Sequence, residues 1–141
     1  MHKAVMQRAP HSDVFIAVAA VADWYVTNAS DQKLKKNQTQ DSPQLEFAPN
    51  PDILAEVAAL ADRPFCVGFA AETEQLLSFA EAKRRRKNIP LLVGNLAQRA
   101  MHADDTELVI FDEQGHDAWP ATDKLTAARK LIQRIALQLE P

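Results

Sequence analysis

Two hydrophobic patterns alternate along the chain, and together they predict an α/β fold. Short apolar runs, typical of strands buried on both faces of a parallel sheet, occur near 13–20, 65–71 and 91–93. Apolar residues at helical spacing lie between them, from about 51 to 62 and from about 73 to 87. Such crossovers are right-handed, so we expect a three-layer sandwich around a mostly parallel, Rossmann-like sheet.

The ends of the chain are expected to add other elements. Residues 1–9 look like a helix that Pro10 ends, and 44–48 is a candidate short edge strand. Residues 107–119 have the pattern of a β-hairpin, followed by a helix over about 122–139. The stripe of this last helix expected to face the core is Leu125, Ala128, Ile132, Ile135 and Leu139. No repeat or linker interrupts the sequence, so one domain over 1–141 is expected.

Composition places the chain among ordinary globular proteins and narrows its partners. Apolar residues make up 47% and charged residues 25%, which is typical of globular domains. The net charge of −3 argues against general binding to nucleic acid or an anionic membrane. Without a signal peptide or an apolar run of spanning length, a cytoplasmic location is expected. The single cysteine, Cys66, lies in an apolar run, which indicates a buried side chain rather than a nucleophile.

Positive charge is concentrated at 33–36 and 83–87, which favours a local anion site. Asp23 and Asn95 follow the first and third predicted strands, and ligands of open α/β sheets bind at these carboxyl ends. Simpler explanations stay open. A solvated helix end accounts for 83–87, and a solvated loop explains 33–36 as well as a ligand loop does. Capping alone accounts for Asn50 before Pro51, and Asp23 fits a turn.

Other familiar constellations are not in the sequence. Three glycines cannot build a GxGxxG or Walker loop, and no nucleophile elbow occurs. The four histidines have no metal-site spacing, so no metal-ligating residue is predicted. An enzyme with this sequence would work by holding anions in place.

Several segments form a more specific combination: AAVADW at 19–24, KLKK at 33–36, NPDIL at 50–54, GFAAET at 68–73, and Lys83, Lys87 and Asn95. Together they resemble phosphopantothenoylcysteine synthetase, in particular the carboxyl-terminal part of that domain in the bacterial bifunctional coenzyme A biosynthesis flavoprotein. The order and approximate spacing match over almost the whole chain.

The resemblance implies a CTP-dependent ligase. The carboxylate of 4′-phosphopantothenate attacks the α-phosphate of CTP, giving an acyl-cytidylate and pyrophosphate. The amine of cysteine then displaces CMP and forms the amide, and Mg²⁺ accompanies the triphosphate. Because the first step sets a carboxylate against a tetra-anionic nucleotide, cations must offset the repulsion, and lysines do so as point charges.

The resemblance also assigns residues to the nucleotide. Lys33 would meet the triphosphate and is the best catalytic candidate. Asn50 to Ile53 and Phe69 would enclose the cytidine. The full set expected to bind CTP is Ala17, Val18, Ala19, Asp23, Lys33, Asn50, Pro51, Asp52, Ile53, Phe69, Lys83 and Lys87. Lys83 and Lys87 thereby become phosphate ligands, whereas Arg84 to Arg86 keep the interpretation of a solvated helix end.

The chain departs from the family at Pro90 and Leu96, where acids are usual, which bears more on ribose or dimer contacts than on catalysis. It also lacks the glycine-rich strand–loop, the segment whose asparagine holds the acyl intermediate, and the decarboxylase domain. An incomplete synthetase domain carrying the CTP-binding half is therefore expected.

A homodimer is implied too, with Val109, Phe111 and Trp119 as its expected apolar surface. Two other functions stay open: a non-catalytic nucleotide-binding or assembly module on the same scaffold, and a Rossmann-like binder of another nucleotide. The lack of a glycine loop counts against NAD.

Overall fold

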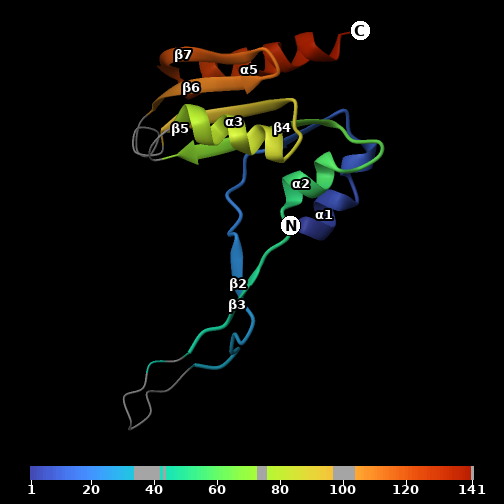
Figure 1. Cartoon of the computed structure of the whole chain (residues 1–141), viewed down its shortest axis with the longest axis vertical. Helices are drawn as coiled ribbons and strands as arrows, with labels where there is room; N and C mark the ends of the chain where they lie inside the picture. Colours follow the sequence, from blue (N-terminus) through green and yellow to red (C-terminus); the bar gives the residue numbers. More distant parts are fainter. Residues whose placement is uncertain (34–41, 43, 73–75, 97–103, 141) are drawn as a thin grey trace. The chain divides into compact units, whose positions relative to one another are not determined.

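The chain folds into two compact units, residues 1–18 with 53–141 and residues 19–52, which we describe in turn. The computed structural model describes residues 1–33, 42, 44–72, 76–96 and 104–140 of the 141. The larger unit contains a five-stranded sheet and the smaller unit a two-stranded one (Figure 1). No change of composition in the sequence marks the boundaries at 18 and 53.

The sheet of the larger unit is mixed, with strand order β1-β4-β5-β6-β7. Its parallel part consists of β1 (Val14–Ala17), β4 (Phe65–Glu72) and β5 (Leu91–Leu96). The hairpin of β6 (Asp105–Asp112) and β7 (Gly115–Asp123) continues the sheet in antiparallel pairing. The predicted fold class and C-terminal hairpin are confirmed.

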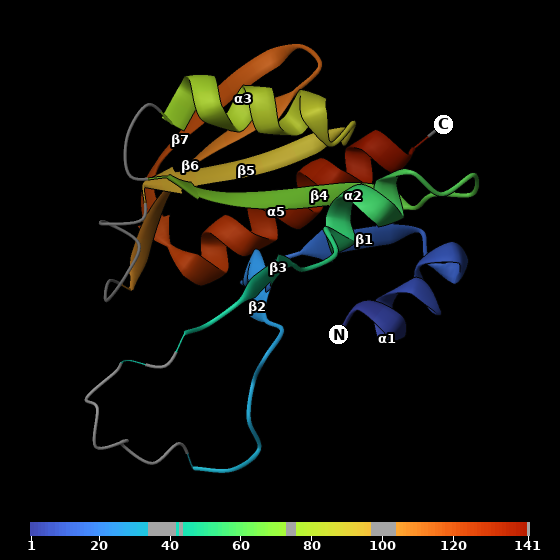
Figure 2. The same cartoon turned by 60° about the horizontal axis from the view of Figure 1, so that its bottom comes forward.

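Helices cover both faces of this sheet. Those of one face are α1 (His2–Met6), the 3-10 turn η1 (Ala9–His11), α2 (Ile53–Ala58) and α3 (Leu76–Arg86). Helix α5 (Lys124–Leu139) covers the other face, and Figure 2 shows the sheet between α3 and α5. In the described part of the chain, no helix is long and apolar enough to cross a membrane.

Alternation along β4 divides the core into two clusters, one on each face. Cys66 packs with the helices of the α2 face, and Val67 packs with α5. Cys66 is fully buried, as predicted, and its thiol donates to the carbonyl oxygen of Pro64 at 3.3 Å. Burial raises the pKa of this thiol, so it remains protonated and unreactive near neutral pH.

The first strand is shorter and less buried than predicted. β1 has four residues, all of them half-buried, because it lies at the edge of the sheet. The apolar run continues beyond Ala17, but Val18, the last residue of this part of the larger unit, is 64% exposed, and Val21, in the smaller unit, is 44% exposed. The prediction of a strand buried on both faces over 13–20 is therefore wrong, since the continuous apolar run does not stay within the sheet.

Helix α5 is confirmed, but the predicted core stripe is only partly correct. The Asp123 carboxylate caps the helix by accepting from the Thr126 amide at 2.9 Å. Hydrogen bonding to the Thr126 side chain, and then to its amide, lowers the pKa of Asp123. The buried residues of α5 are Ala127, Leu131 and Ile135. Leu125, Ile132 and Leu139 of the expected stripe are instead 60%, 54% and 45% exposed.

Contacts with the β6–β7 hairpin account for this rotation of α5. The Arg134 guanidinium pairs with the carboxylates of Asp112 and Asp117. The Lys130 ammonium lies 4.1 Å from the centre of the Trp119 ring, whose Nε1 donates to Asp117. Apolar residues occupy more than one stripe of this helix, and these polar contacts select the stripe that faces the core.

The same hairpin contradicts the dimer surface expected from the sequence. Phe111 and Trp119 are only 1% and 5% exposed, and Val109 is half-buried against the core. Both aromatic rings pack inside the larger unit, because α3 packs on β6, which carries Phe111, and α5 packs on β7, which carries Trp119. They are therefore core residues.

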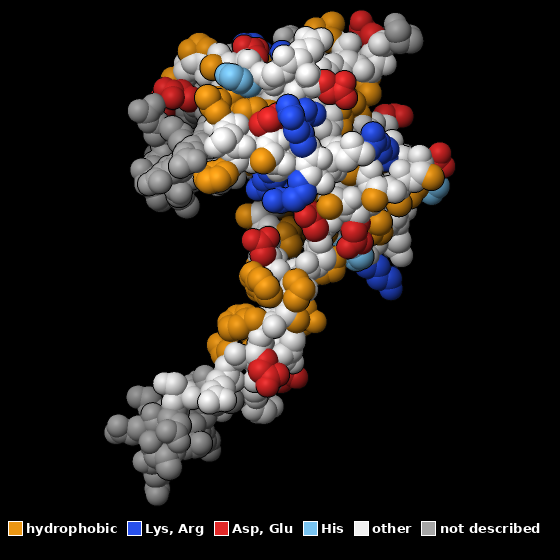
Figure 3. All heavy atoms as spheres, in the orientation of Figure 1, with side chains coloured by type: hydrophobic (Ala, Val, Ile, Leu, Met, Phe, Trp, Pro, Cys, Tyr) orange, Lys and Arg blue, Asp and Glu red, His pale blue; other side chains and the backbone are white. Residues whose placement is uncertain are grey.

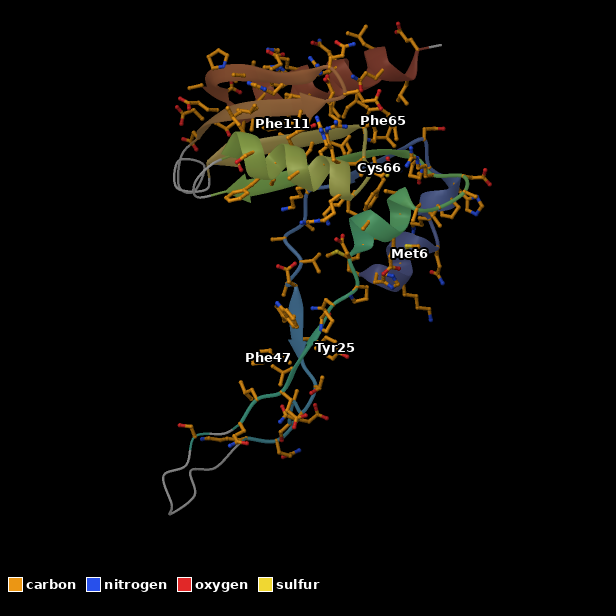
Figure 4. All side chains as sticks on the ribbon, in the orientation of Figure 1. Met6, Tyr25, Phe47, Phe65, Cys66 and Phe111 are labelled. Carbon is orange, nitrogen blue, oxygen red and sulfur yellow. The ribbon has the colours of Figure 1, made fainter. Side chains whose placement is uncertain are left out.

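The smaller unit is an antiparallel ribbon of β2 (Trp24–Val26) and β3 (Phe47–Pro49). The predicted edge strand at 44–48 thus begins three residues later and pairs with β2 outside the main sheet. Strand β2 was not predicted, although two aromatic residues before a valine are typical of strands. Hydrophobic side chains are exposed along this unit (Figure 3), and Figure 4 shows Tyr25 and Phe47 on its two strands.

Candidate nucleotide site

The three parallel strands of the larger unit end at one edge of the sheet, as predicted. Ala17, the last residue of β1, pairs with Gly68 of β4, and Asn95 of β5 pairs with Ala71. Ala17, Phe69 and Asn95 therefore lie on neighbouring strands near the carboxyl ends. This is the edge where ligands of α/β sheets bind.

Helix α2 packs closely onto β4 beside this edge, and Gly68 makes the approach possible. A Cβ atom at Gly68 would lie 2.8 Å from Cδ1 of Ile89 and 2.9 Å from Cδ2 of Leu54. Side-chain carbons do not normally approach so closely, so a methyl group at this position would force the ends of Ile89 and Leu54 to shift. Through this contact Leu54, the last residue of NPDIL, packs against Gly68, the first residue of GFAAET.

Ile53 and Phe69, both expected to enclose the cytidine, have side chains on opposite faces of the sheet. Ile53 is half-buried against the cluster that contains Leu54 and Cys66. Phe69 is half-buried against the α5 cluster, together with Ile16. The larger unit therefore does not bring these two side chains together, and their joint contact with a base stays a prediction.

Within the smaller unit, Asn50 joins the segments AAVADW and NPDIL. Its backbone amide donates to the carbonyl oxygen of Asp23 at 2.8 Å, and its side-chain Nδ2 donates to that of Ala22 at 2.9 Å. The sequence had indicated that Asn50 caps the following helix. Helix α2 begins only at Ile53, so Asn50 lies too early in the chain to be its N-cap, and that interpretation is wrong. Its side chain connects two segments instead. The remaining candidates here, Ala19, Asp23, Pro51 and Asp52, are exposed.

The predicted cations lie in different settings. Lys33 is exposed in the smaller unit, directly after a turn in which the Ser30 hydroxyl donates to the carbonyl oxygen of Gln32 and accepts from its amide. The other two lysines of KLKK lie outside the described residues. Lys83 is in the last turn of α3 and Lys87 follows the helix; both are half-buried and interact with neighbouring groups.

Helix α3 runs from the carboxyl end of β4 to the amino end of β5. Lys87 immediately precedes the turn into β5, and Lys83 lies about 6 Å back along the helix. From Leu91 at the start of β5 to Asn95 is about 13 Å along the strand. These two lysines therefore lie back along α3 from the edge that carries Ala17, Phe69 and Asn95, and their contact with the same ligand stays a prediction.

Arg84 corrects the interpretation of 84–86 as a wholly solvated helix end. It is only 8% exposed, because its guanidinium donates to the Glu81 carboxylate at 3.0 and 3.1 Å and to the carbonyl oxygen of Ile89 at 3.2 Å. The hydrogen bond from Arg84 lowers the pKa of Glu81, and the pKa of Arg84 is raised in turn. Arg84 thus connects the end of α3 to the residues just before β5. The sequence KRRRK alone does not indicate which of its arginines makes this contact.

A cavity of about 310 Å³ lies at the opposite, amino-terminal edge of the sheet. Its lining comprises Phe65, Pro90, Asp112, Glu113, Gln114 and Gln138. Among the residues that the structure describes, this lining has two carboxylates and no lysine or arginine, which makes it unsuited to a triphosphate. The carboxyl edge therefore remains the candidate nucleotide site.

Comparison with known proteins supports the family resemblance that these segments indicated. Residues 1–139 match the model of the family described as DNA/pantothenate metabolism flavoprotein C-terminal domain. The chain belongs to this family. The coenzyme A biosynthesis bifunctional protein CoaBC of Vibrio cholerae is 39% identical over 143 residues, covering 99% of this chain. The resemblance inferred from the sequence motifs is thereby confirmed.

Solved structures of similar proteins have the same fold as this chain. The crystal structure of the C-terminal domain of CoaBC matches 98% of this chain with a TM-score of 0.76 and 26% identity. A Cab2 mutant in complex with phosphopantothenate-cysteine matches 86% with a TM-score of 0.63 and 22% identity, which shows the same fold. The chain spans 36% of the Vibrio protein and 60% of the solved CoaBC domain.

Proposed function

We propose that this chain supplies the CTP-binding half of a phosphopantothenate–cysteine ligase in coenzyme A biosynthesis. Family membership supports the pathway. The observation that carries the proposal is that the assigned segments meet in pairs. Asn50 bonds to AAVADW, Leu54 packs at Gly68 of GFAAET, and Ala17 pairs with the same glycine.

In this proposal each group does what its chemistry allows. The Ala17 to Ala19 backbone and the Asp23 carboxylate line the nucleotide, and backbone groups of 50–53 and Phe69 contact the cytosine. The Lys33 ammonium binds the triphosphate and offsets negative charge while the substrate carboxylate attacks the α-phosphate and pyrophosphate leaves. Lys83 and Lys87 complete the cation set. Cysteine then attacks the acyl-cytidylate, releasing CMP.

We propose that Mg²⁺ enters coordinated by the triphosphate, as is usual for enzymes that use nucleotides. Among the described residues, no group of three or more His, Cys, Asp or Glu side chains could hold a metal ion. The protein's own contribution would then be the lysine charges and backbone donors around the phosphates.

Binding and turnover should separate in this chain when it is tested alone. We expect weak binding of CTP with Mg²⁺ but no useful formation of phosphopantothenoylcysteine, because the proposed ligase needs a further segment for the acyl intermediate. Holding two anions in attack geometry is a large part of such catalysis. Isothermal calorimetry with CTP, with ATP as the comparison, measures binding, and a pyrophosphate-release assay measures turnover.

Each result of these assays has one meaning. Absence of nucleotide binding would contradict the proposal and favour a non-catalytic assembly module on the same scaffold. That alternative has one observation in its favour, the exposed Leu125, Ile132 and Leu139 on α5. Tighter binding of ATP than of CTP would indicate a nucleotide binder of other specificity. Efficient turnover would show that the CTP-binding half is sufficient.

We also propose that the protein forms a homodimer through one face of the β2–β3 ribbon. Residues opposite each other on paired strands share a face, which here puts Trp24, Val26, Phe47 and Pro49 together. Trp24 and Phe47 are each 60% exposed. A two-stranded ribbon is marginally stable in water by itself, so covering this face with a second copy would stabilise it.

Replacing Trp24 and Phe47 together by serine should convert the dimer to monomer. Tyr25→Ser is the matched control, because Tyr25 is 49% exposed on the other face of the same ribbon. Multi-angle light scattering over a concentration series measures the mass. A wild-type chain that stays monomeric at every concentration would remove this part of the proposal, as would an equal effect of both changes.

A further inference from the structure

The side chain of Asn28 closes the end of the β2–β3 ribbon that lies beyond the pair Val26 and Phe47. Its Nδ2 donates to the carbonyl oxygen of Gln44 at 3.0 Å, and its Oδ1 accepts from the amide of Glu46 at 3.0 Å. The backbone amide of Thr27 adds a bond to the carbonyl oxygen of Glu46 at 2.8 Å. A side-chain amide both donates and accepts, so Asn28 satisfies two backbone groups at once.

These bonds lie on either side of the segment that contains Lys33. Asn28 precedes that lysine by five residues, whereas Gln44 and Glu46 follow it. The turn of Ser30 and Gln32 leads directly into Lys33. No residue of β2 or β3 is buried, so hydrogen bonds rather than a core order this unit.

We propose that Asn28 is a positioning residue for Lys33. By fixing the pairing where the Lys33 segment leaves the ribbon, it determines where the lysine ammonium can meet the triphosphate. The inference rests on the proposed function, in which Lys33 binds CTP, and Asn28 itself contacts no substrate. Fixing the described residues that lead into Lys33 in advance lowers the entropic cost of binding an anion there.

Asn50, another asparagine of this unit, supports a division of labour. Asn50 makes its bonds at the end of the ribbon beside Trp24 and Pro49, where its side chain donates to the carbonyl oxygen of Ala22 and its backbone amide donates to that of Asp23. These residues belong to the segments expected to bind the nucleotide directly. Asn28 makes its bonds at the other end of the ribbon, where the segment containing Lys33 begins.

A double-mutant cycle tests whether Asn28 acts through Lys33. Asn28→Ala should weaken binding of Mg²⁺–CTP about three- to tenfold, the effect of losing roughly one net hydrogen bond. In a Lys33→Ala background the same change should have no further effect, because the group that it positions is gone. Asn28→Asp keeps the acceptor but loses the donor, so it should weaken binding in the same way.

The matched control is Gln44→Ala, which leaves the backbone carbonyl that Asn28 binds and should not change affinity. Amide hydrogen exchange at Glu46, followed by NMR, reports the Asn28 clamp, meaning the hydrogen bonds of Asn28 to Gln44 and Glu46, without any nucleotide. Exchange should accelerate in Asn28→Ala, which removes the acceptor of the Glu46 amide, but not in Gln44→Ala.

Three outcomes would overturn the assignment. Equal losses of affinity in both backgrounds would make Asn28 a purely structural residue. Unchanged affinity with faster exchange at Glu46 would show a clamp that does not govern Lys33. If the wild-type chain binds no CTP, the proposed function fails, and the assignment to Lys33 fails with it, while the exchange data still report the clamp.

Discussion

Lys33→Ala is expected to weaken binding of Mg²⁺–CTP by about 1.5–3 kcal/mol, or roughly 10- to 150-fold, the range for a hydrogen bond to a charged group. The physical reason is that a flexible, exposed ammonium group can approach the phosphates without losing a structural contact. Lys33→Arg should recover only part of the affinity, because the guanidinium has a different shape and hydration. Calorimetry at fixed Mg²⁺ and ionic strength measures the change.

The control for this experiment is Lys3→Ala on α1, which makes the same chemical change and the same change of net charge at an exposed position. We expect affinity to change little there. Equal losses from the two substitutions would reduce the role of Lys33 to a contribution to overall positive charge. Rising salt should weaken wild-type binding and reduce the difference between wild type and Lys33→Ala, since exposed charges are screened.

Gly68→Ala should lower the free energy of unfolding by about 1–3 kcal/mol, the usual cost of adding a methyl group to a packed core. The added Cβ would meet terminal carbons of Leu54 and Ile89 at 2.9 and 2.8 Å. Both side chains are buried, so neither can move without disturbing its neighbours. Chemical denaturation measures the stability. We expect weaker CTP binding as well, since the same contact joins NPDIL to GFAAET.

A second substitution separates this steric account from a general effect of Gly68. Leu54→Ala alone should cost about 2–5 kcal/mol by opening a cavity. In that background Gly68→Ala should cost clearly less than in the wild type, because the methyl group enters part of the space that Leu54 vacates. Full additivity of the two changes would contradict the proposed contact. Some cost should persist, because Ile89 still has to move.

Much of the larger unit was predictable from periodicity. Apolar runs near 65–71 and 91–93 mark β4 and β5, because strands in the middle of a parallel sheet are covered on both faces. The same criterion failed at β1, an edge strand of four residues. An apolar run favours burial, but it does not specify which surface will cover it. The length and burial of the strand therefore could not be predicted from the run.

The candidate site was predicted as a set of segments rather than as a geometry. The resemblance identified Asn50 and Phe69 as site residues. It did not predict that the Asn50 side chain donates to the carbonyl oxygen of Ala22, or that Phe69 packs on the face of the sheet that α5 covers. The ribbon that carries Trp24 and Phe47 was missed, because β2 has only three residues and no alternating pattern. No local signal marks Asn28, whose partners lie 16 and 18 residues away.

The sequence by itself determined the fold class, the order of the main strands and helices, and the family, since these depend on local periodicity and on short motifs. Only the tertiary structure decided which of several apolar stripes faces a core. It turned α5 so that Arg134 reaches Asp112 and Asp117, and it buried Phe111 and Trp119 in the unit itself. The physical reason is that burial and hydrogen bonding are properties of pairs. The hydrophobicity or charge of a residue determines whether it favours burial or a polar partner. The neighbours that the fold brings to it determine which contacts it makes.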